Sequence, residues 1–373
     1  MRTSGIKIGK LLGIEIFLDY SWFLIFALLI WLFSANYFPS LNATASVQTN
    51  IILAVITSVL LFASALTHEL LHSIVANKNG LKINRITLFL FGGIAELFEE
   101  PDNARTEFRI AIAGPITSFV LAGIFFAIFF FTRGYNHLFN ITVLAATMSQ
   151  INLLFGMFNL LPGFPLDGGR ILRSIAWGLT KNLKKATQIA SDSGKIIAVL
   201  VIAFGILRII TTDLFSGAWL ILIGLFLYQA AGQGYMELLI RTALEKVQIK
   251  QILNKNMLTV TPYLTINSLI EEFFLKYNVD NLPVILDNTV VGTISLDDIR
   301  KNSARITEET RVYEMMRSFL HNFYLQENDK VIDALKLMVS KNVGFVSILE
   351  ENKLVGILTV DDIAKYLADK KVI

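Results

Sequence analysis

The sequence contains no cysteine and few charged residues. Without cysteine, disulfides, thiolate metal sites and cysteine nucleophiles are excluded, so a bound metal must be held by histidine and carboxylate side chains. Only 17% of the 373 residues are charged, whereas soluble domains carry about a quarter, so the chain is not one soluble globule. Proline is also scarce, at 7 residues, which argues against a disordered or collagen-like chain. The net charge of +3 is too small to indicate a nucleic-acid partner.

Hydrophobic residues make up 54% of the chain, and they are concentrated before residue 240. A helix needs about 20 apolar residues to cross the hydrocarbon of a bilayer. Six stretches predict such helices: about 20–36, 50–76, 109–132, 138–161, 196–212 and 217–236. The last two are short and are the least well specified. After Arg241 the sequence becomes charged and alternating, so we expect a membrane-embedded domain over 1–240 followed by a water-exposed module.

Basic residues predict the orientation of these spans. They gather at the start of the chain and after the second and fourth spans, whereas the loops 37–49 and 211–216 contain none. Cytoplasmic loops of membrane proteins are enriched in Lys and Arg, so both termini are expected in the cytoplasm of a multi-pass cell-membrane protein. The start, Met1–Gly13, is too basic and broken for a signal peptide, and we expect the first span to remain as an anchor. The lysines at 181–185 are expected to contact lipid headgroups.

Two further segments are not expected to cross the membrane. Residues 83–97 carry β-branched and aromatic residues around Gly92-Gly93, which predicts a hairpin or a re-entrant strand pair. Residues 171–190 have the pattern of an amphipathic helix that lies on the membrane surface.

The second span contains His68-Glu69-Leu70-Leu71-His72. Two histidines four residues apart lie on one face of a helix, about one turn from each other. That spacing allows both imidazoles to bind one Zn²⁺, with the intervening glutamate close to the reacting water. Polar groups on a membrane helix are costly, which favours a compensating ion. The alternative is a chance polar turn that lines the bundle interior or a proton path.

A catalytic zinc usually has three protein ligands, so a third residue is needed. Asp167 is the best candidate, because it follows the fourth span at the cytoplasmic end, where the inner part of the second span also lies. Pro162, Gly163 and Pro165 break the helix before it, and such breaks are tolerated where the backbone lines a polar cavity. The alternative is that Asp167 is a turn residue in Asp-Gly-Gly.

These motifs resemble the site-2 protease family of intramembrane zinc metalloproteases, peptidase family M50. His68–His72 matches the first family motif, and Asn159–Gly169 matches the second. Gly92-Gly93 and Ala113-Gly114-Pro115 resemble two weaker elements. Ser118 is a departure, since many members carry asparagine there.

The resemblance implies a six-helix α-helical membrane domain with a membrane-associated hairpin, and one Zn²⁺ held by His68, His72 and Asp167. Glu69 would be the general base, and Asn159 would bind the substrate near the developing oxyanion, although it could equally make a hydrogen bond within the bundle. The substrate would be a membrane-spanning protein that unwinds locally. The strand edge at 83–97 could hold the unwound segment by β-addition, or could form a purely structural hairpin.

The C-terminal module repeats itself, because Val291–Ile299 recurs as Val355–Ile363. Each repeat is predicted to run strand–helix–strand–strand–helix, which indicates one pseudo-symmetric α/β module. The module resembles a tandem pair of CBS domains, with boundaries expected at 246–305 and 306–373.

In the CBS family the motif Gly-x-x-Ser/Thr-x-x-Asp binds adenine nucleotides such as ATP or AMP. The motif occurs here twice, and the resemblance implies that Ser295, Asp298, Thr359 and Asp362 bind a nucleotide. The same pattern is also a helix capping motif. The alternative is therefore a module that binds no ligand and mediates pairing or homodimerisation.

The sequence as a whole predicts a membrane zinc endopeptidase with a cytoplasmic regulatory module. A channel or transporter is the main rival, since CBS pairs also occur on such proteins, and a second rival is a metal-binding membrane protein without catalysis. A transporter is expected to show repeated halves, and none is visible in 1–236. The remaining histidines, His137 and His321, lack spaced partners and are expected at the surface.

Overall fold

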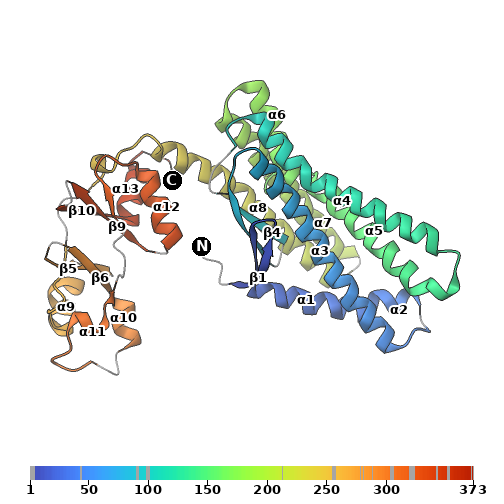
Figure 1. The fold of residues 1–373 in the computed structure, drawn as a ribbon, viewed down its shortest axis with the longest axis horizontal. Coiled ribbons are helices and arrows are strands. Elements are labelled where there is room, and N and C mark those ends of the chain that lie inside the picture. Colours follow the sequence, from blue (N-terminus) through green and yellow to red (C-terminus); the bar gives the residue numbers. More distant parts are fainter. Residues whose placement is uncertain are drawn as a thin grey trace. The chain divides into compact units, whose positions relative to one another are not determined.

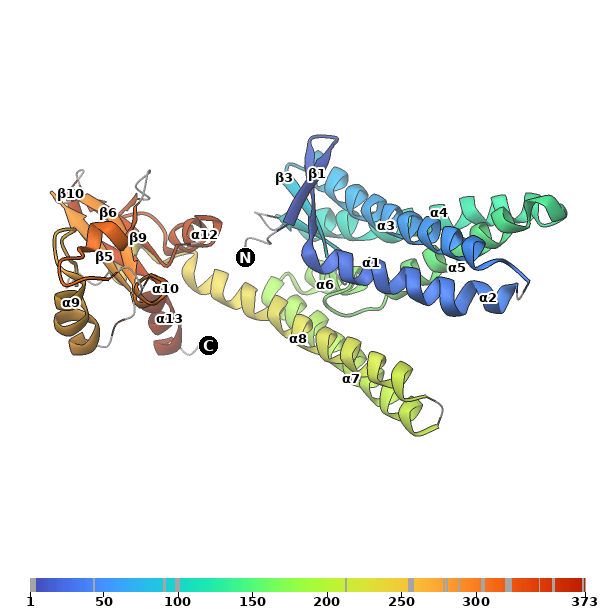
Figure 2. The same cartoon turned by 90° about the horizontal axis from the view of Figure 1, so that it is seen from below.

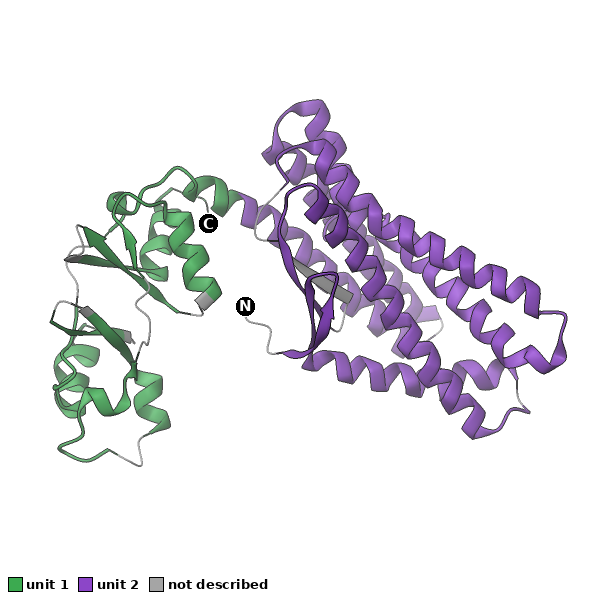
Figure 3. Ribbon diagram, viewed as in Figure 1, with its two compact units in different colours: residues 1–2, 239–373 green, residues 3–238 purple. Residues whose placement is uncertain are grey.

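A computed structural model gives the fold of residues 5–42, 44–89, 92–97, 101–211, 213–253, 258–277, 279, 281–287, 289–302, 306–318, 324–341, 343–350, 353–370 and 372. The chain divides into two compact units, and the division falls between Leu238 and Leu239 (Figure 3).

The unit before Leu239 is mainly helical. Its elements in chain order are β1 (Gly5–Leu11), β2 (Ile14–Asp19), α1 (Tyr20–Leu32), η1 (Phe33–Tyr37), α2 (Phe38–Leu41), α3 (Val47–Lys78), β3 (Ile83–Phe89), β4 (Gly92–Leu97), α4 (Ala104–Thr132), η2 (Asn136–Leu138), α5 (Phe139–Asn159), α6 (Asp167–Thr180), α7 (Leu183–Thr211) and α8 (Leu214–Leu244) (Figure 1).

In the part of the chain that the structure describes, six helical stretches are long and apolar enough to cross a bilayer. They are Tyr20–Leu41, Val47–Lys78, Ala104–Thr132, Asn136–Asn159, Leu183–Thr211 and Leu214–Leu244. The six predicted spans are thus confirmed, and the two that the sequence specified least well are the long helices α7 and α8.

Polar side chains cap the first turn of two spanning helices, α3 and α4. Ser46 accepts a hydrogen bond from the backbone N–H of Thr49 at 3.1 Å, and Asn103 accepts one from Thr106 at 2.9 Å. These bonds satisfy backbone donors that have no partner within the first turn of α3 and α4.

The predicted surface helix over 171–190 is wrong in extent. Helix α6 ends at Thr180, because Lys181 adopts a left-handed conformation with φ of 54°, a common way to end a helix. Asn182 then accepts a hydrogen bond from the N–H of Lys185 at 3.0 Å and starts α7. Residues 183–190 therefore belong to a membrane-crossing helix.

A four-stranded sheet packs against α3. Its strand order is β1-β2-β3-β4, with β2 and β3 parallel and the other pairs antiparallel. The predicted strand pair at 83–97 is confirmed within its described residues, whereas β1 and β2 were not expected. Buried Ile14 and Ile86 pack with Leu66 and Leu70 of α3, on either side of His68 in the sequence. The sheet thus lies beside the helical turn that carries the histidines.

Helices α7 and α8 lie side by side and are joined by a short connection (Figure 2). Glycines allow their backbones to approach closely, since a Cβ on Gly217 would lie 2.6 Å from the carbonyl oxygen of Gly205. Such small-residue contacts are typical of helix packing in membranes.

The unit from Leu239 onward is an α/β module with two three-stranded sheets, ordered β5-β6-β7 and β10-β9-β8. Its elements are η3 (Ile249–Gln251), α9 (Ile266–Leu269), η4 (Ile270–Leu275), β5 (Asn281–Leu286), β6 (Thr289–Ser295), α10 (Leu296–Lys301), α11 (Val312–Met315), β7 (Arg317–Ser318), β8 (Tyr324–Gln326), α12 (Val331–Lys341), β9 (Phe345–Glu350), β10 (Lys353–Thr359) and α13 (Val360–Asp369). The predicted α/β repeat is confirmed.

The two repeats of this module exchange their leading segments. Leu244, Val247 and Ile249 are buried in the core of the second repeat, beside Val331. Val312, at the start of the second repeat, is buried in the core of the first. Each sequence repeat therefore needs the other to complete its core.

Candidate metal centre

Three side chains from two helices converge at one point inside the membrane unit. Nε2 of His68 lies 3.0 Å from Oδ2 of Asp167, Nε2 of His72 lies 3.2 Å from the same oxygen, and the two Nε2 atoms are 3.2 Å apart. Both histidines are buried, with exposed fractions of 1% and 4%. The described residues contain one cluster of metal-ligating side chains, and it consists of these three.

Helix α4 fixes the orientation of both imidazole rings. Nδ1 of His68 lies 2.9 Å from Oγ of Ser118, and Nδ1 of His72 lies 2.6 Å from the carbonyl oxygen of Ile110. The Nδ1 atoms are thereby engaged, so each Nε2 is directed to the shared point. Ser118, the apparent departure from the family motif, thus contacts a proposed ligand directly. The carbonyl of Ile110 could not have been found from sequence, since any residue supplies one.

Gly114 provides the space at this point. A Cβ on Gly114 would lie 2.1 Å from Nε2 of His72 and 2.4 Å from Nε2 of His68. Ile110, Gly114 and Ser118 are spaced by four residues, so they form one stripe along α4 that faces the histidines. The glycine of the Ala-Gly-Pro element is therefore explained by the room that the centre requires.

Asp167 is the first residue of α6 rather than a turn residue. The two glycines that follow it allow close backbone contact, because a Cβ on Gly168 would lie 2.3 Å from the carbonyl oxygen of Leu160, and one on Gly169 would lie 2.3 Å from the backbone of Gly163. The start of α6 is thus pressed onto the segment that links it to α5, which holds the carboxylate in place.

The donor set fits a zinc ion. A tetrahedral ion with bonds of about 2.0–2.1 Å separates its ligand atoms by about 3.3 Å. The three donor atoms here are 3.0–3.2 Å apart, and they are two imidazole nitrogens and one carboxylate oxygen. A catalytic site of this kind leaves its fourth position open for water or substrate.

Glu69 and Asn159 do not belong to the cluster of three. Glu69 is close enough to His72, Asp167 and Arg170 for their charges to interact. Asn159 is the last residue of α5 and is partly buried. Within the described residues its side chain makes no hydrogen bond, and its role in substrate binding stays a prediction.

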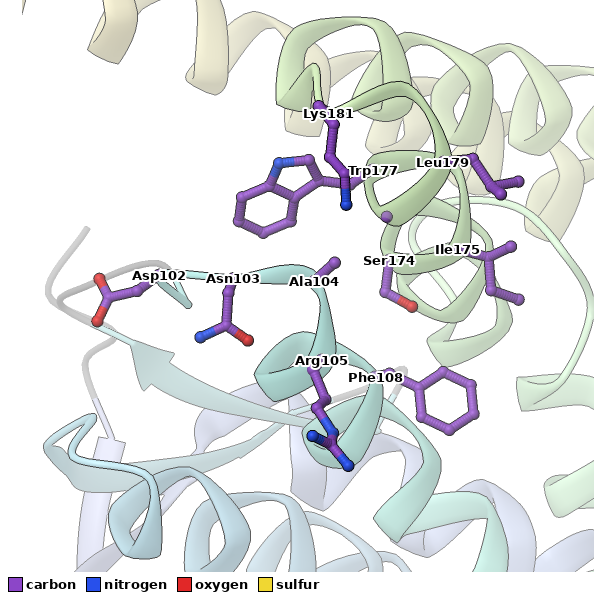
Figure 4. A pocket seen from close by; sticks show the side chains of 11 residues that line it. Asp102, Asn103, Ala104, Arg105, Phe108, Ser174, Ile175, Trp177, Leu179 and Lys181 are labelled. Atoms are coloured by element: carbon purple, nitrogen blue, oxygen red, sulfur yellow. The ribbon is translucent and has the colours of Figure 1, made fainter.

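A pocket of about 680 Å³ lies between the start of α4 and the C-terminal half of α6, and it is separate from the cluster. Ala104, Arg105 and Phe108 of α4 line one side of it, and Ser174 and Trp177 of α6 line the other (Figure 4). None of the three clustered residues lines this pocket. The view shows that the start of α4 and the C-terminal half of α6 are neighbours.

In the α/β module, the predicted nucleotide-binding residues cap helices. Oγ of Ser295 accepts the N–H of Asp298 at 3.1 Å, and Oγ1 of Thr359 does the same for Asp362. Arg317 also donates to Asp298 at 2.8 Å. Although burial alone would raise the pKa of Asp298, the bonds from Ser295 and Arg317 hold that pKa below its ordinary value. The capping alternative is thus visible, and nucleotide binding stays a prediction.

The two remaining histidines do not join any site among the described residues. His137 is exposed in η2, whereas His321 lies outside the described residues.

Two buried histidines one turn apart on a membrane-crossing helix, with a carboxylate beside them, form the donor set expected of a membrane-embedded metalloprotease. Comparison with protein families agrees. The model of peptidase family M50 matches residues 56–150 and 135–202, and the CBS domain model matches residues 249–305 and 312–369. The chain belongs to peptidase family M50, the site-2 protease family, and carries a tandem CBS pair.

Two proteins from other organisms are similar to this one over nearly the whole chain. A protein of Synechocystis sp., named for zinc metalloprotease activity, is 31% identical over 98% of this chain and 96% of its own length. Zinc metalloprotease MJ0392 of Methanocaldococcus jannaschii is 31% identical with the same coverage. The solved site-2 protease of Methanocaldococcus jannaschii is 34% identical, covers 62% of this chain and 95% of its own, and has a TM-score of 0.43.

Replacement of Ser118 by alanine is expected to weaken metal binding without removing a ligand. The change deletes the partner of His68 Nδ1, which sets the ring orientation. Loss of such a partner typically costs 10–100-fold in metal affinity, so chelator competition on purified protein will show a dissociation constant raised by about that factor. Thr117→Ala is the matched control, since its hydroxyl bonds the backbone of its own helix. Equal affinities in both variants would contradict the orienting role.

Proposed function

We propose that this protein is a zinc endopeptidase that hydrolyses peptide bonds of membrane-spanning proteins. His68, His72 and Asp167 are the proposed zinc ligands, and Glu69 is the proposed general base. One observation carries the proposal: donor atoms of these three side chains lie 3.0–3.2 Å apart, with Glu69 adjacent in the sequence to His68.

When bound, zinc polarises the peptide carbonyl and a water molecule. The protein supplies the remaining steps. Glu69 accepts the proton of the water that attacks the carbonyl carbon, and it delivers that proton to the amide nitrogen as the C–N bond breaks. The side-chain amide of Asn159 donates to the carbonyl oxygen as negative charge develops there, an effect of order 3 kcal/mol at comparable sites.

The substrate must reach the centre as an extended segment, because helical peptide bonds are shielded. The sheet offers two free edges within the described residues, β1 and β4, since β3 is paired on both sides. Of the two, β4 is the proposed docking edge, because it belongs to the 83–97 element and contacts α3. An added substrate strand would gain main-chain hydrogen bonds there.

The proposed orientation places both termini and the CBS pair in the cytoplasm. In that orientation the C-terminal end of α3, which carries His68 and His72 and ends at Lys78, is on the cytoplasmic side. The water that hydrolysis consumes therefore enters from the cytoplasm. Basic residues flanking α3 and α6, such as Lys78, Lys82 and Lys184, support this orientation.

Membrane proteomics tests the proposed activity in cells. Cells that express the wild-type protein are expected to yield peptides with new termini inside membrane-spanning segments, and cells with the Glu69→Gln variant are expected to lack them. Identical peptide sets, or new termini restricted to soluble segments, would overturn the proposal.

The CBS pair is proposed to bind an adenine nucleotide through Ser295, Asp298, Thr359 and Asp362, and to regulate the protease. Titration of the full-length protein with ATP and with AMP is expected to give binding heat, which the Asp362→Asn variant reduces because it loses the carboxylate for the ribose hydroxyls. Asp369→Asn, at the exposed end of α13, is the control. Absence of heat with both nucleotides would leave pairing or homodimerisation as the role of the module.

A further inference from the structure

A buried ion pair joins α4 to α6. Glu107, in the first turn of α4, has no exposed surface, and Arg173 of α6 is 8% exposed. Nε of Arg173 donates to Oε1 of Glu107 at 2.5 Å, and a second guanidinium nitrogen contacts the same oxygen. The other oxygen of Glu107 has no hydrogen-bond partner within the described residues. Among those residues, the positive charge of Arg173 balances the buried carboxylate of Glu107.

Such a pair adds little to stability compared with apolar residues of the same volume, because both ions lose their hydration. Breaking it is nevertheless costly, since one charge is then left buried without its partner. The sequence pattern suggested that Arg173 is simply one of the cytoplasmic basic residues, but its side chain is not at the water surface. A buried pair of this kind points to a positional role.

The two partners lie on the two helices that carry and support the metal cluster. Glu107 continues the stripe of α4 formed by Ile110, Gly114 and Ser118, which orients both imidazoles. Arg173 is six residues after Asp167 on α6, about 9 Å along the helix axis. The ion pair therefore links the support of the two histidines to the helix that carries the third ligand.

Arg173 also contacts the segment that leads into Asp167. Its guanidinium lies 5.3 Å from the ring centroid of Phe164, a cation–π distance. Phe164 is anchored in turn, because its N–H donates to the carbonyl oxygen of Ala190 at 3.1 Å and its ring packs with Ala190 and Ala231. Arg173 thus contacts α4 and the segment before α6 at once.

We infer that Glu107 and Arg173 are positioning residues that set the place of Asp167 relative to His68 and His72. The inference rests on the proposed zinc assignment of those three residues. Neither Glu107 nor Arg173 touches the cluster in the described contacts, so both act through the helices and the Phe164 segment.

The test uses purified full-length protein and measures zinc affinity by chelator competition together with the visible spectrum of the Co²⁺-substituted protein. Glu107→Gln keeps the shape and removes the charge, and it is expected to weaken zinc binding by about 10- to 100-fold and to change the Co²⁺ bands. Arg173→Met is expected to do the same, whereas Arg173→Lys, which keeps a cation, retains part of the affinity.

Two controls separate positioning from general destabilisation. Arg105→Gln removes an exposed positive charge near the start of the same helix, and Leu53→Ala removes buried volume near Phe38, in a different cluster. Both are expected to keep wild-type zinc affinity and Co²⁺ bands, although Leu53→Ala lowers the melting temperature. If the single variants do not fold, the double variant Glu107→Leu with Arg173→Met avoids an unpaired buried charge and is expected to fold and bind zinc more weakly.

The outcomes are distinct. Wild-type affinity and unchanged bands in Glu107→Gln, Arg173→Met or the double variant would overturn the positioning role while the zinc assignment stands. If the wild-type protein itself binds no zinc at this site, the proposed function fails instead.

Discussion

Glu69→Gln is expected to abolish peptide cleavage while the protein keeps its metal. The substitution preserves the size of the side chain and leaves the proposed ligands His68, His72 and Asp167 in place, but glutamine cannot accept the proton of the attacking water. General-base catalysis contributes about 10²–10⁴-fold to such reactions, so the rate of cleavage of a membrane-spanning peptide in liposomes should fall by that factor. Elemental analysis should still find about one zinc per chain.

The matched control for this change is Glu237→Gln, which removes a carboxylate from α8 rather than from the helix that carries the histidines. It is expected to retain wild-type activity. Substantial cleavage by the Glu69→Gln protein would show that another group takes the proton, and simultaneous loss of zinc would show that Glu69 has a structural role instead.

Gly114→Ala is expected to eliminate metal binding, although it adds a single methyl group. That carbon would lie 2.1 Å and 2.4 Å from the two Nε2 atoms, at the point where the ion is expected. Neither ring can retreat easily, because each is held through its Nδ1. The purified variant should contain little zinc and should have no measurable activity.

Helix α4 offers a close control in Gly123→Ala, since a Cβ there meets no atom within 4 Å. This variant is expected to bind zinc and to cleave like the wild type, and alanine should favour the helix slightly. If Gly114→Ala retains a full equivalent of zinc, the ion does not lie between the histidines and α4 as the geometry requires.

Most of the candidate metal centre could be predicted from the sequence, because its proposed ligands obey simple spacing rules. His68 and His72 are one turn apart on a helix, and Asp167 stands at a helix break, so their chemistry is visible in the residue types alone. The contacts that orient the two imidazole rings are harder to predict from the sequence. The carbonyl of Ile110 has no sequence signal, and the role of Ser118 depends on how α4 packs against α3.

Some strands, helix boundaries and ion pairs were also harder to predict from the sequence. Strands β1 and β2 occupy a basic segment interrupted by Gly9 and Gly13, and besides pairing with each other they join a sheet through β3, far along the chain, which pairs with β2. The boundary between α6 and α7 depends on a left-handed lysine, Lys181, which no local rule predicts. The Glu107–Arg173 pair likewise joins residues that are distant in sequence.

In the CBS pair the sequence predicted the repeat but not how its halves combine. The duplicated strands and helices follow directly from the recurrence of 291–299 as 355–363. The exchange of Leu244–Ile249 and Val312 between the two cores does not, because the side chains that each segment buries are apolar and either core could accept them. Tertiary packing decides between such equivalent choices.

X-ray absorption at the zinc edge of the purified full-length protein tests the central claim most directly. The account predicts about one zinc per chain, with two imidazole nitrogens and carboxylate oxygen at about 2.0–2.1 Å, and with one nitrogen fewer in the His72→Ala variant. A wild-type protein without zinc, or with a first shell that His72→Ala leaves unchanged, would contradict it.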